Sequence, residues 1–193
     1  AVFSIYSNSL HGPFVFDSVS TIERNESIRI TSLNWEELKK SMNSFSSGSR
    51  PVSMLSFAVN YYFHQNDVFG YHLVNIFIHL SNALLLYFIL QIIFGLLQGS
   101  SSLVNNRLIP FYSALLWLVH PLHTESVSYI VQRENSMATM FFLLSVLLFL
   151  RARSSENIGR SRILFISSVL AGITAFFSKQ NAGTLPIFIF LLE

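Results

Sequence analysis

One run of apolar residues constrains this chain more than any other feature. Residues 71–97, YHLVNIFIHLSNALLLYFILQIIFGLL, contain no aspartate, glutamate, lysine or arginine. A helix of roughly 20 apolar residues crosses the hydrocarbon of a bilayer, so this run predicts a transmembrane helix. The composition agrees, because 51% of the residues are hydrophobic and only 11% are charged, whereas about 25% are charged in soluble domains.

Further apolar runs repeat this pattern along the chain. We expect the end of a first membrane helix and four later membrane helices, at residues 1–8, 108–119, 137–150, 163–177 and 185–193. The run at 108–119 is also short enough for a re-entrant helix. The sequence therefore predicts an all-α, polytopic transmembrane bundle. Because the sequence stops inside an apolar run, we also expect it to be a fragment of a longer chain.

The polar region between the first two membrane helices, residues 9–69, is the largest segment outside the hydrocarbon. Within it, SLNWEELKKSMN predicts a short surface helix capped by Ser32 or Asn34. The segment RPVSMLSFAVNYYFHQ starts with a proline suited to a first helical turn. It mixes apolar with small polar residues, which predicts an interfacial helix.

Four arginines in RARSSENIGRSR give the membrane domain a direction. Short loops rich in arginine lie on the cytoplasmic side. If the run at 108–119 crosses the membrane, three polar segments emerge together on the opposite, outer face: residues 10–69, residues 120–136 and SKQNAG. The first of these also holds basic residues, but loops of about 60 residues count for less under this rule.

The charge and the cysteine count exclude several kinds of site. The net charge of +2 gives no extended basic surface for a nucleic-acid backbone, so nucleic acid is not an expected partner. The chain has no cysteine, which excludes disulfides, thiolate nucleophiles and zinc–thiolate sites. Any chemistry must use carboxylates, histidines, hydroxyls or cations.

Four polar residues interrupt the apolar run at 71–97. They are spaced by three, four and three residues, so they share one helical face: His72, Asn75, His79 and Asn82. Such a face either joins neighbouring helices through hydrogen bonds or lines a substrate cavity.

Several charged residues are expected at the outer boundary. The acids are Asp17, Glu125 and Glu134, and the cations are Arg50, Arg133 and Lys179. Partial desolvation by the preceding apolar residues would make Asp17 a better proton acceptor, although it could equally cap a turn. The cations suit a lipid-borne phosphate, although long basic side chains also extend from helix ends to the headgroups.

The start of the 120–136 segment has residues that could bind a divalent metal. His120, His123 and Glu125 carry suitable ligand atoms. Because the residue before a proline avoids helical geometry, His120 and His123 are better suited to shaping the turn. A metal cofactor held by His123 and Glu125 therefore stays open as an alternative.

Five sequence blocks resemble a known family in their order along the chain. They are NSLHGPFVFDS, RPVSMLSFAVNYYF, GYHLVNIFIHLSNALLLY, HPLHTESVSYIVQRENSMATMFFLLS and SKQNAGTLP. They resemble the amino-terminal membrane half of bacterial TPR-containing membrane proteins and of the transmembrane and TPR-repeat-containing O-mannosyltransferases. More distantly, they resemble protein O-mannosyltransferases of the GT-C class.

The resemblance implies a fold, a reaction and residue roles. It implies a GT-C-like membrane domain, with TPR repeats expected downstream, in a bacterial inner membrane with its active face outward. Such an enzyme transfers a sugar from a polyprenyl-phosphate donor to a hydroxyl acceptor such as a protein. Asp17 would be the base, Glu125 and Glu134 would shape the site, and Arg133 and Lys179 would hold the departing phosphate, with Arg50 a further phosphate-binding or positioning residue.

One departure from the family pattern keeps other functions open. The family commonly has a paired acidic motif where this chain has Asp17 followed by Ser18. A non-catalytic membrane module, which anchors TPR repeats or only binds polyprenyl phosphate, is therefore an alternative. A transporter that uses the polar face of residues 72–82 as its pathway is a third.

Overall fold

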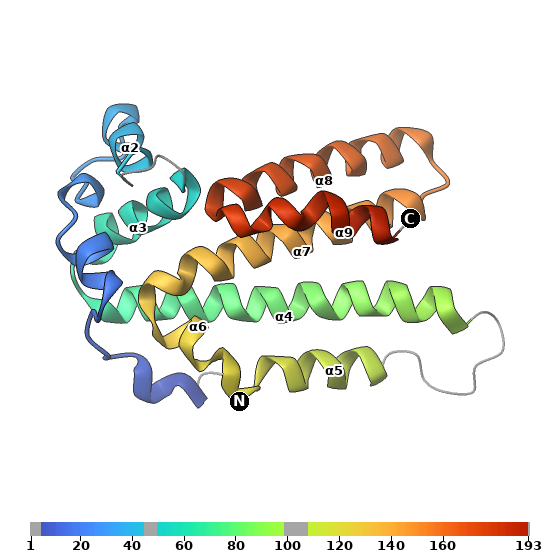
Figure 1. The fold of residues 1–193 in the computed structure, drawn as a ribbon, viewed down its shortest axis with the longest axis horizontal. Coiled ribbons are helices and arrows are strands. Elements are labelled where there is room, and N and C mark those ends of the chain that lie inside the picture. Colours follow the sequence, from blue (N-terminus) through green and yellow to red (C-terminus); the bar gives the residue numbers. More distant parts are fainter. Residues whose placement is uncertain (1–4, 45–49, 99–107, 193) are drawn as a thin grey trace.

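All regular elements in the described part of the chain are helical, which confirms the predicted all-α fold (Figure 1). This computed structural model describes residues 5–44, 50–98 and 108–192. Three of its helices are long and apolar enough to cross a membrane: α4 (Val68–Gln98), α7 (Arg133–Arg153) and α8 (Ile158–Ser178). Two shorter apolar helices accompany them: α5 (Leu108–Leu118) and α9 (Leu185–Leu192).

Three helices begin earlier than the apolar runs suggested, and the first of them, α4, begins at Val68 rather than at residue 71. Helix α7 begins at Arg133 rather than at residue 137, so its first turn is polar. Helix α8 begins at residue 158 rather than at 163, because Asn157 caps it through a hydrogen bond from the Arg160 N–H. Most of the predicted arginine-rich loop is therefore helical, and only residues 154–157 form a turn between α7 and α8. Of the expected first helix, residues 1–4 lie outside the described residues, and η1 (Ser7–Ser9) follows a short helical stretch.

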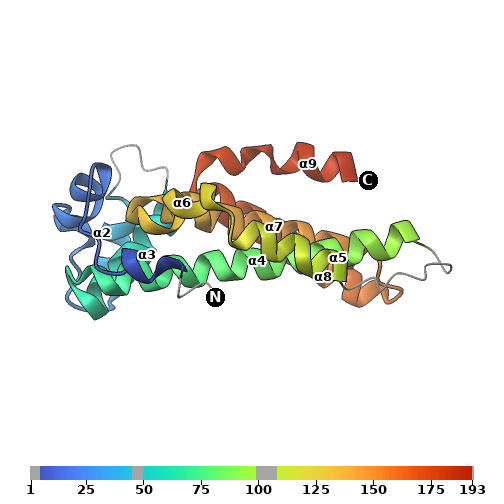
Figure 2. The same cartoon turned by 90° about the horizontal axis from the view of Figure 1, so that it is seen from below.

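The long helices run side by side along the molecule (Figures 1 and 2). Helices α7 and α8 form a close antiparallel pair, and α4 packs against α7 on one side and α5 on the other. Deep in the pair, Ser145 and Ser168 each donate a 2.8 Å hydrogen bond to the other's backbone carbonyl. Small residues of this kind allow membrane helices to approach closely. The close packing therefore fixes the position of the C-terminal end of α8 relative to α7.

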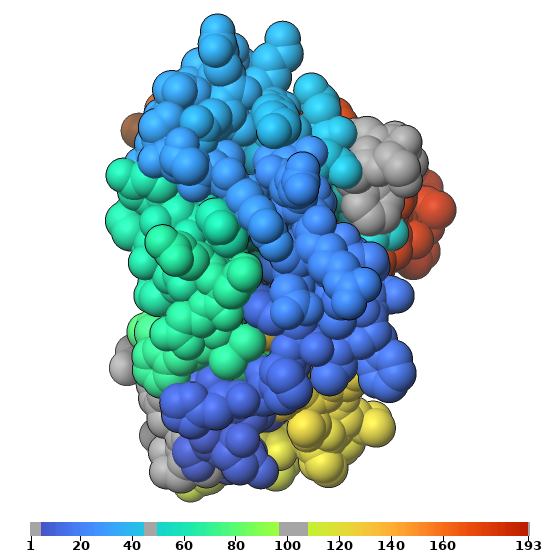
Figure 3. Space-filling model, turned by 90° about the vertical axis from the view of Figure 1, so that its left-hand side faces the viewer, coloured from blue at the N-terminus to red at the C-terminus, as the bar shows by residue number. Residues whose placement is uncertain are grey.

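Three polar segments meet at one end of this bundle, as the sequence had led us to expect. They are the first loop, residues 119–132 and residues 179–184, whereas the turn at 154–157 lies at the opposite end (Figure 1). Viewed end-on, the first loop covers this surface beside residues of the 120s, coloured yellow (Figure 3). Side chains far apart in the sequence can therefore share a site here.

The first loop is a packed structure with a core of its own. It contains η2 (Val19–Glu23), η3 (Glu26–Ile28), α2 (Trp35–Met42) and α3 (Pro51–His64). Asn34 is the residue that caps α2, by accepting a hydrogen bond from Glu37 N–H at 2.8 Å. The core joins this loop to the long helices through Ile22, Ile28, Ile30, Met54, Phe57, Tyr71 and Ile130. Helix α3 buries one face against this core. The packing therefore holds the first turn of α3 in a fixed position.

Candidate functional site

Asp17 lies on an exposed turn that the 120–136 segment holds in place. Its backbone N–H donates a 2.9 Å hydrogen bond to the hydroxyl oxygen of Tyr129. The preceding residue, Phe16, has a positive φ of 48° and packs edge-on against the Tyr129 ring. The bond to Tyr129 uses the backbone and not the carboxylate of Asp17. Because the residue is also exposed, its carboxylate is accessible from solvent. No sequence pattern had indicated this role of Tyr129.

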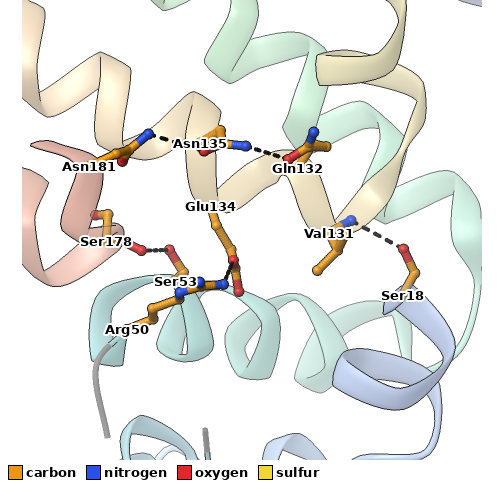
Figure 4. Close-up of polar contacts among 9 residues, drawn as sticks. All are labelled: Ser18, Arg50, Ser53, Val131, Gln132, Glu134, Asn135, Ser178 and Asn181. Atoms are coloured by element: carbon orange, nitrogen blue, oxygen red, sulfur yellow. Dashed lines mark hydrogen bonds and ion pairs between the residues drawn. The ribbon is translucent and has the colours of Figure 1, made fainter. Parts of the chain in front are cut away.

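Ser18 makes a second connection between the same two segments. It is fully buried, and its Oγ accepts a 3.2 Å hydrogen bond from the backbone N–H of Val131 (Figure 4). A carboxylate at this position would have to be buried, which is costly for a charged group. The serine that replaces the second acid of the family motif is therefore part of the packing between the segments.

Glu134 is the buried acid of the site. It lies in the first turn of α7, its side chain is 3% exposed, and it forms an ion pair with Arg50, the N-cap residue of α3 (Figure 4). Its charge also interacts with those of Lys179 and Asp17. Its second oxygen, Oε1, is buried with no hydrogen-bond partner among the described residues. The first loop, α7 and the end of α8 thus bring two carboxylates and two cations together.

Lys179 is the half-buried cation that follows α8. Burial lowers the pKa of its ammonium group, the nearby Glu134 carboxylate opposes this by raising it, and Arg50 lowers it further. The preceding residue, Ser178, accepts a 2.9 Å hydrogen bond from Ser53 Oγ through its backbone carbonyl (Figure 4). Because Ser53 lies in the first turn of α3, this bond fixes α8 relative to the helix that begins after Arg50.

Arg133 takes a different direction from its neighbour Glu134. Its side chain is completely buried, and its donors bond to Asn75 Oδ1 and Asn60 Oδ1, both at 2.8 Å, and to the carbonyl of Tyr71 at 3.0 Å. The guanidinium also lies 4.7 Å from the centroid of the Phe57 ring. A phosphate in the site cannot reach these donors, so the geometry does not support Arg133 as a phosphate ligand. It joins α3, α4 and α7 instead.

The polar face of α4 is buried against the surrounding segments. His72 is bonded to the carbonyl of Gly12 at 3.0 Å, and His79 to that of Leu118 at 2.9 Å. Asn75 donates to the carbonyls of Val127 and Ile130, and Asn82 donates to that of Ser136. All four side chains are at most 2% exposed. These contacts favour the interpretation that the face joins helices over the interpretation that it lines a cavity.

The remaining candidates lie around the short helix α6 (Thr124–Ser128). Glu125 is exposed and accepts a 3.1 Å hydrogen bond from Gln132. His123 packs against Trp117 and His79, and burial is the main cause that lowers its pKa. His120 accepts a bond from Leu122 N–H and so shapes the turn. Within residues 5–44, 50–98 and 108–192, no three acidic or histidine side chains are grouped to hold a metal ion.

An apolar groove of about 650 Å³ runs between α7, α8 and α9. At one end it is lined by Phe177 and Ala182, which flank Lys179 in the sequence, and further along by Phe149 and Ile189. The groove therefore lies within the apolar bundle and includes residues on both sides of Lys179 in the sequence. An acyl or prenyl chain has the shape and polarity to occupy it.

Comparison with known proteins identifies relatives over nearly the whole chain. It is 33% identical to Protein O-mannosyl-transferase TMTC4 of Homo sapiens, over 93% of this chain and 26% of that protein. It is 33% identical to Protein O-mannosyl-transferase TMTC1 of Homo sapiens, over 93% of this chain and 21% of that protein. It is 32% identical to Protein O-mannosyl-transferase F38B6.6 of Caenorhabditis elegans, over 94% and 25%.

The chain thus spans about a quarter of the length of the curated relatives it matches. No family model matches it, and no solved structure matches it. The resemblance to O-mannosyltransferases, stated from the sequence blocks, is confirmed by these relatives. This chain is homologous, over more than nine-tenths of its length, to one segment of the proteins named protein O-mannosyl-transferases.

Proposed function

We propose that this chain carries the catalytic end of a membrane glycosyltransferase that moves a sugar from a polyprenyl-phosphate donor to a hydroxyl group of a protein. The names of its relatives support sugar transfer to protein. The donor, the orientation and the residue roles rest on the arrangement of charges around Glu134.

The observation that carries the proposal is that one buried carboxylate, Glu134, lies within electrostatic reach of an accessible acid and two cations. Asp17 would accept the proton of the acceptor hydroxyl as its oxygen attacks the anomeric carbon. The bond from that carbon to the phosphate oxygen breaks with inversion, and the new negative charge stays on the polyprenyl phosphate. Lys179 and Arg50 would stabilise that charge as it develops.

Glu134 would serve this reaction by positioning the cations. Its ion pair holds Arg50 at the start of α3, and its charge counteracts the burial of Lys179. It would also supply the second acid near Asp17, which Ser18 does not. Glu125 is exposed on α6 beside Gln132, where it could contact the acceptor or the sugar.

The apolar groove supports a lipid-linked donor. A prenyl chain between α7, α8 and α9 would lie in the hydrocarbon, and its phosphate would emerge at Lys179. The four arginines near the opposite end of α7 and α8 support an orientation with the site facing outward under the positive-inside rule. The resemblance to bacterial TPR-containing proteins, stated from the sequence blocks, is what supports a bacterial inner membrane.

The test compares sugar transfer by the native full-length protein and by Asp17→Asn, with a polyprenyl-phosphate mannose donor and a peptide acceptor. Loss of a general base lowers the rate by about 10²- to 10⁴-fold, and Asp17 is exposed, so the substitution should leave the fold intact. Glu36→Gln is the matched control, because Glu36 is an exposed acid on α2 in the same loop. Equal rates for native and Asp17→Asn would reject Asp17 as the base.

The alternative of a non-catalytic module makes a different prediction. The native protein would then bind polyprenyl phosphate but transfer no sugar to any acceptor, and Asp17→Asn would leave that binding unchanged. Its support is the serine after Asp17, although the buried contact of Ser18 with Val131 gives that serine a role in packing.

A further inference from the structure

A cavity with charged and polar lining residues lies at the end of the bundle opposite the candidate site. It has a volume of about 520 Å³ and is formed by the turn at 154–157 together with α4, α7 and α8. Its polar lining includes Arg151, Arg160 and Ser154, and its apolar lining includes Ile92 and Leu164. Leu164 follows Arg160 by about one turn of α8, so this apolar residue lies further from the start of the helix than the arginine.

The depth of this cavity corresponds to the headgroup region of a bilayer. The apolar stretch that includes α7 ends at Arg153, and the next one begins at Ile158. Arg151 is held by α4, since its guanidinium lies 5.9 Å from the centroid of the Phe88 ring. Arg160 extends from the first turn of α8, next to the Asn157 cap. Among the described residues, neither arginine makes an ion pair.

We propose that this cavity binds the phosphodiester of a membrane glycerophospholipid, with the phosphate between Arg151 and Arg160 and an acyl chain along Ile92 and Leu164. Guanidinium groups bind phosphate through paired, charge-assisted hydrogen bonds. Basic pockets between membrane helices on the cytoplasmic side are suited to lipid headgroups. The site lies at the far end of the bundle from Asp17, so it goes beyond the proposed transfer reaction.

Glu156 also lines the cavity and restricts the class of headgroup. A carboxylate disfavours a second negative charge close to the phosphate, so a headgroup with one negative charge fits better than one with two. On the neighbouring face of the same turn, Arg153 and Arg162 line another cavity. Their charge favours an anionic lipid, such as phosphatidylglycerol, over a zwitterionic one.

The test measures lipid retained by the full-length protein, using native mass spectrometry after exchange into phosphatidylglycerol or phosphatidylcholine vesicles. Arg151→Gln/Arg160→Gln should weaken phosphatidylglycerol binding by roughly thirty-fold, or about 2 kcal/mol, from two arginines at the headgroups. The matched control, Arg153→Gln/Arg162→Gln, removes the same charge from the neighbouring cavity and should weaken binding only a few-fold. Equal losses for both double variants would overturn the proposal.

Two further arms identify the ligand and check the fold. Glu156→Gln should strengthen phosphatidylglycerol binding and leave phosphatidylcholine binding unchanged, whereas the reverse would overturn the preference for an anionic lipid. Inorganic phosphate should not displace the bound lipid, and displacement would point to a soluble phosphate instead. Arg151→Lys/Arg160→Lys retains the charge and should bind more lipid than the glutamine variant at an unchanged Tm, whereas equally weak binding would overturn the assignment of these two charges.

Discussion

The Nε–H of Arg133 donates a 2.8 Å hydrogen bond to Oδ1 of Asn75, and this contact joins α7 to α4 through a charged donor and a neutral acceptor. Asn75 uses its amide group at the same time to hold the carbonyls of Val127 and Ile130. One asparagine therefore connects the buried cation with the segment that precedes α7. The position of Glu134, the next residue along the chain, depends on this network.

The first prediction concerns the stability that Arg133 provides. Arg133→Ala should lower the free energy of unfolding by about 3–5 kcal/mol, because the buried acceptors of Asn75, Asn60 and Tyr71 lose their donor and each unpaired buried group costs about 1–3 kcal/mol. Arg133→Lys should retain only a small part of the stability that is lost in Arg133→Ala, since an ammonium group cannot match the planar guanidinium. Thermal unfolding in detergent measures both variants. An Arg133→Lys variant as stable as the native protein would contradict this network.

The second prediction concerns the ion pair between Arg50 and Glu134. The Glu134 side chain is 3% exposed and that of Arg50 is 23% exposed, so an unpaired Glu134 cannot be solvated as well as an unpaired Arg50. Arg50→Gln should therefore destabilise the protein more than Glu134→Gln, with a coupling of about 2 kcal/mol in a double-mutant cycle. Chemical unfolding of the four variants gives this coupling. A value near zero would mean that the pair is not formed.

The sequence was sufficient to predict most of the fold, because hydropathy and length identify membrane helices. The spacing of His72, Asn75, His79 and Asn82 also predicted that they share one helical face. The alternation of membrane crossings predicted that the three polar segments lie at one end of the bundle. It could not predict which way Arg133 turns, since a cation at a membrane boundary can face lipid headgroups, a ligand or the protein interior. That choice depends on Asn60 and Asn75, which lie on other helices.

The third prediction concerns pH and Lys179. Because burial lowers the pKa of this lysine below its ordinary 10.5, its ammonium loses its proton at a lower pH than that of an exposed lysine. If the charge holds the donor phosphate, the KM for the donor should rise across the alkaline range below that value. Glu134→Gln should move this rise to lower pH, because the Glu134 carboxylate raises the lysine pKa.

Lys179→Arg separates charge from other effects of alkaline pH. Its guanidinium stays protonated, so its donor KM should remain constant over the range in which that of the native enzyme rises. A parallel rise in the KM of native and Lys179→Arg enzymes would show that another group causes the pH dependence. The exposed lysine variant Lys39→Arg serves as the matched control.

The last prediction compares two asparagines on the same face of α4. Asn75 makes three hydrogen bonds, one of them with the buried Arg133. Asn82 makes one bond, to the carbonyl of Ser136, and its buried Oδ1 has no partner among the described residues. Asn75→Ala should therefore cost about 3 kcal/mol, because it leaves the Arg133 donor unpaired. Asn82→Ala should cost no more than about 1 kcal/mol, since single hydrogen bonds between membrane helices contribute about 0.6 kcal/mol on average.

Thermal unfolding in detergent checks this order, and sugar transfer per folded molecule should be unchanged in Asn82→Ala. If Asn82→Ala abolished activity at unchanged stability, the face would have a direct functional role, as the transporter interpretation requires.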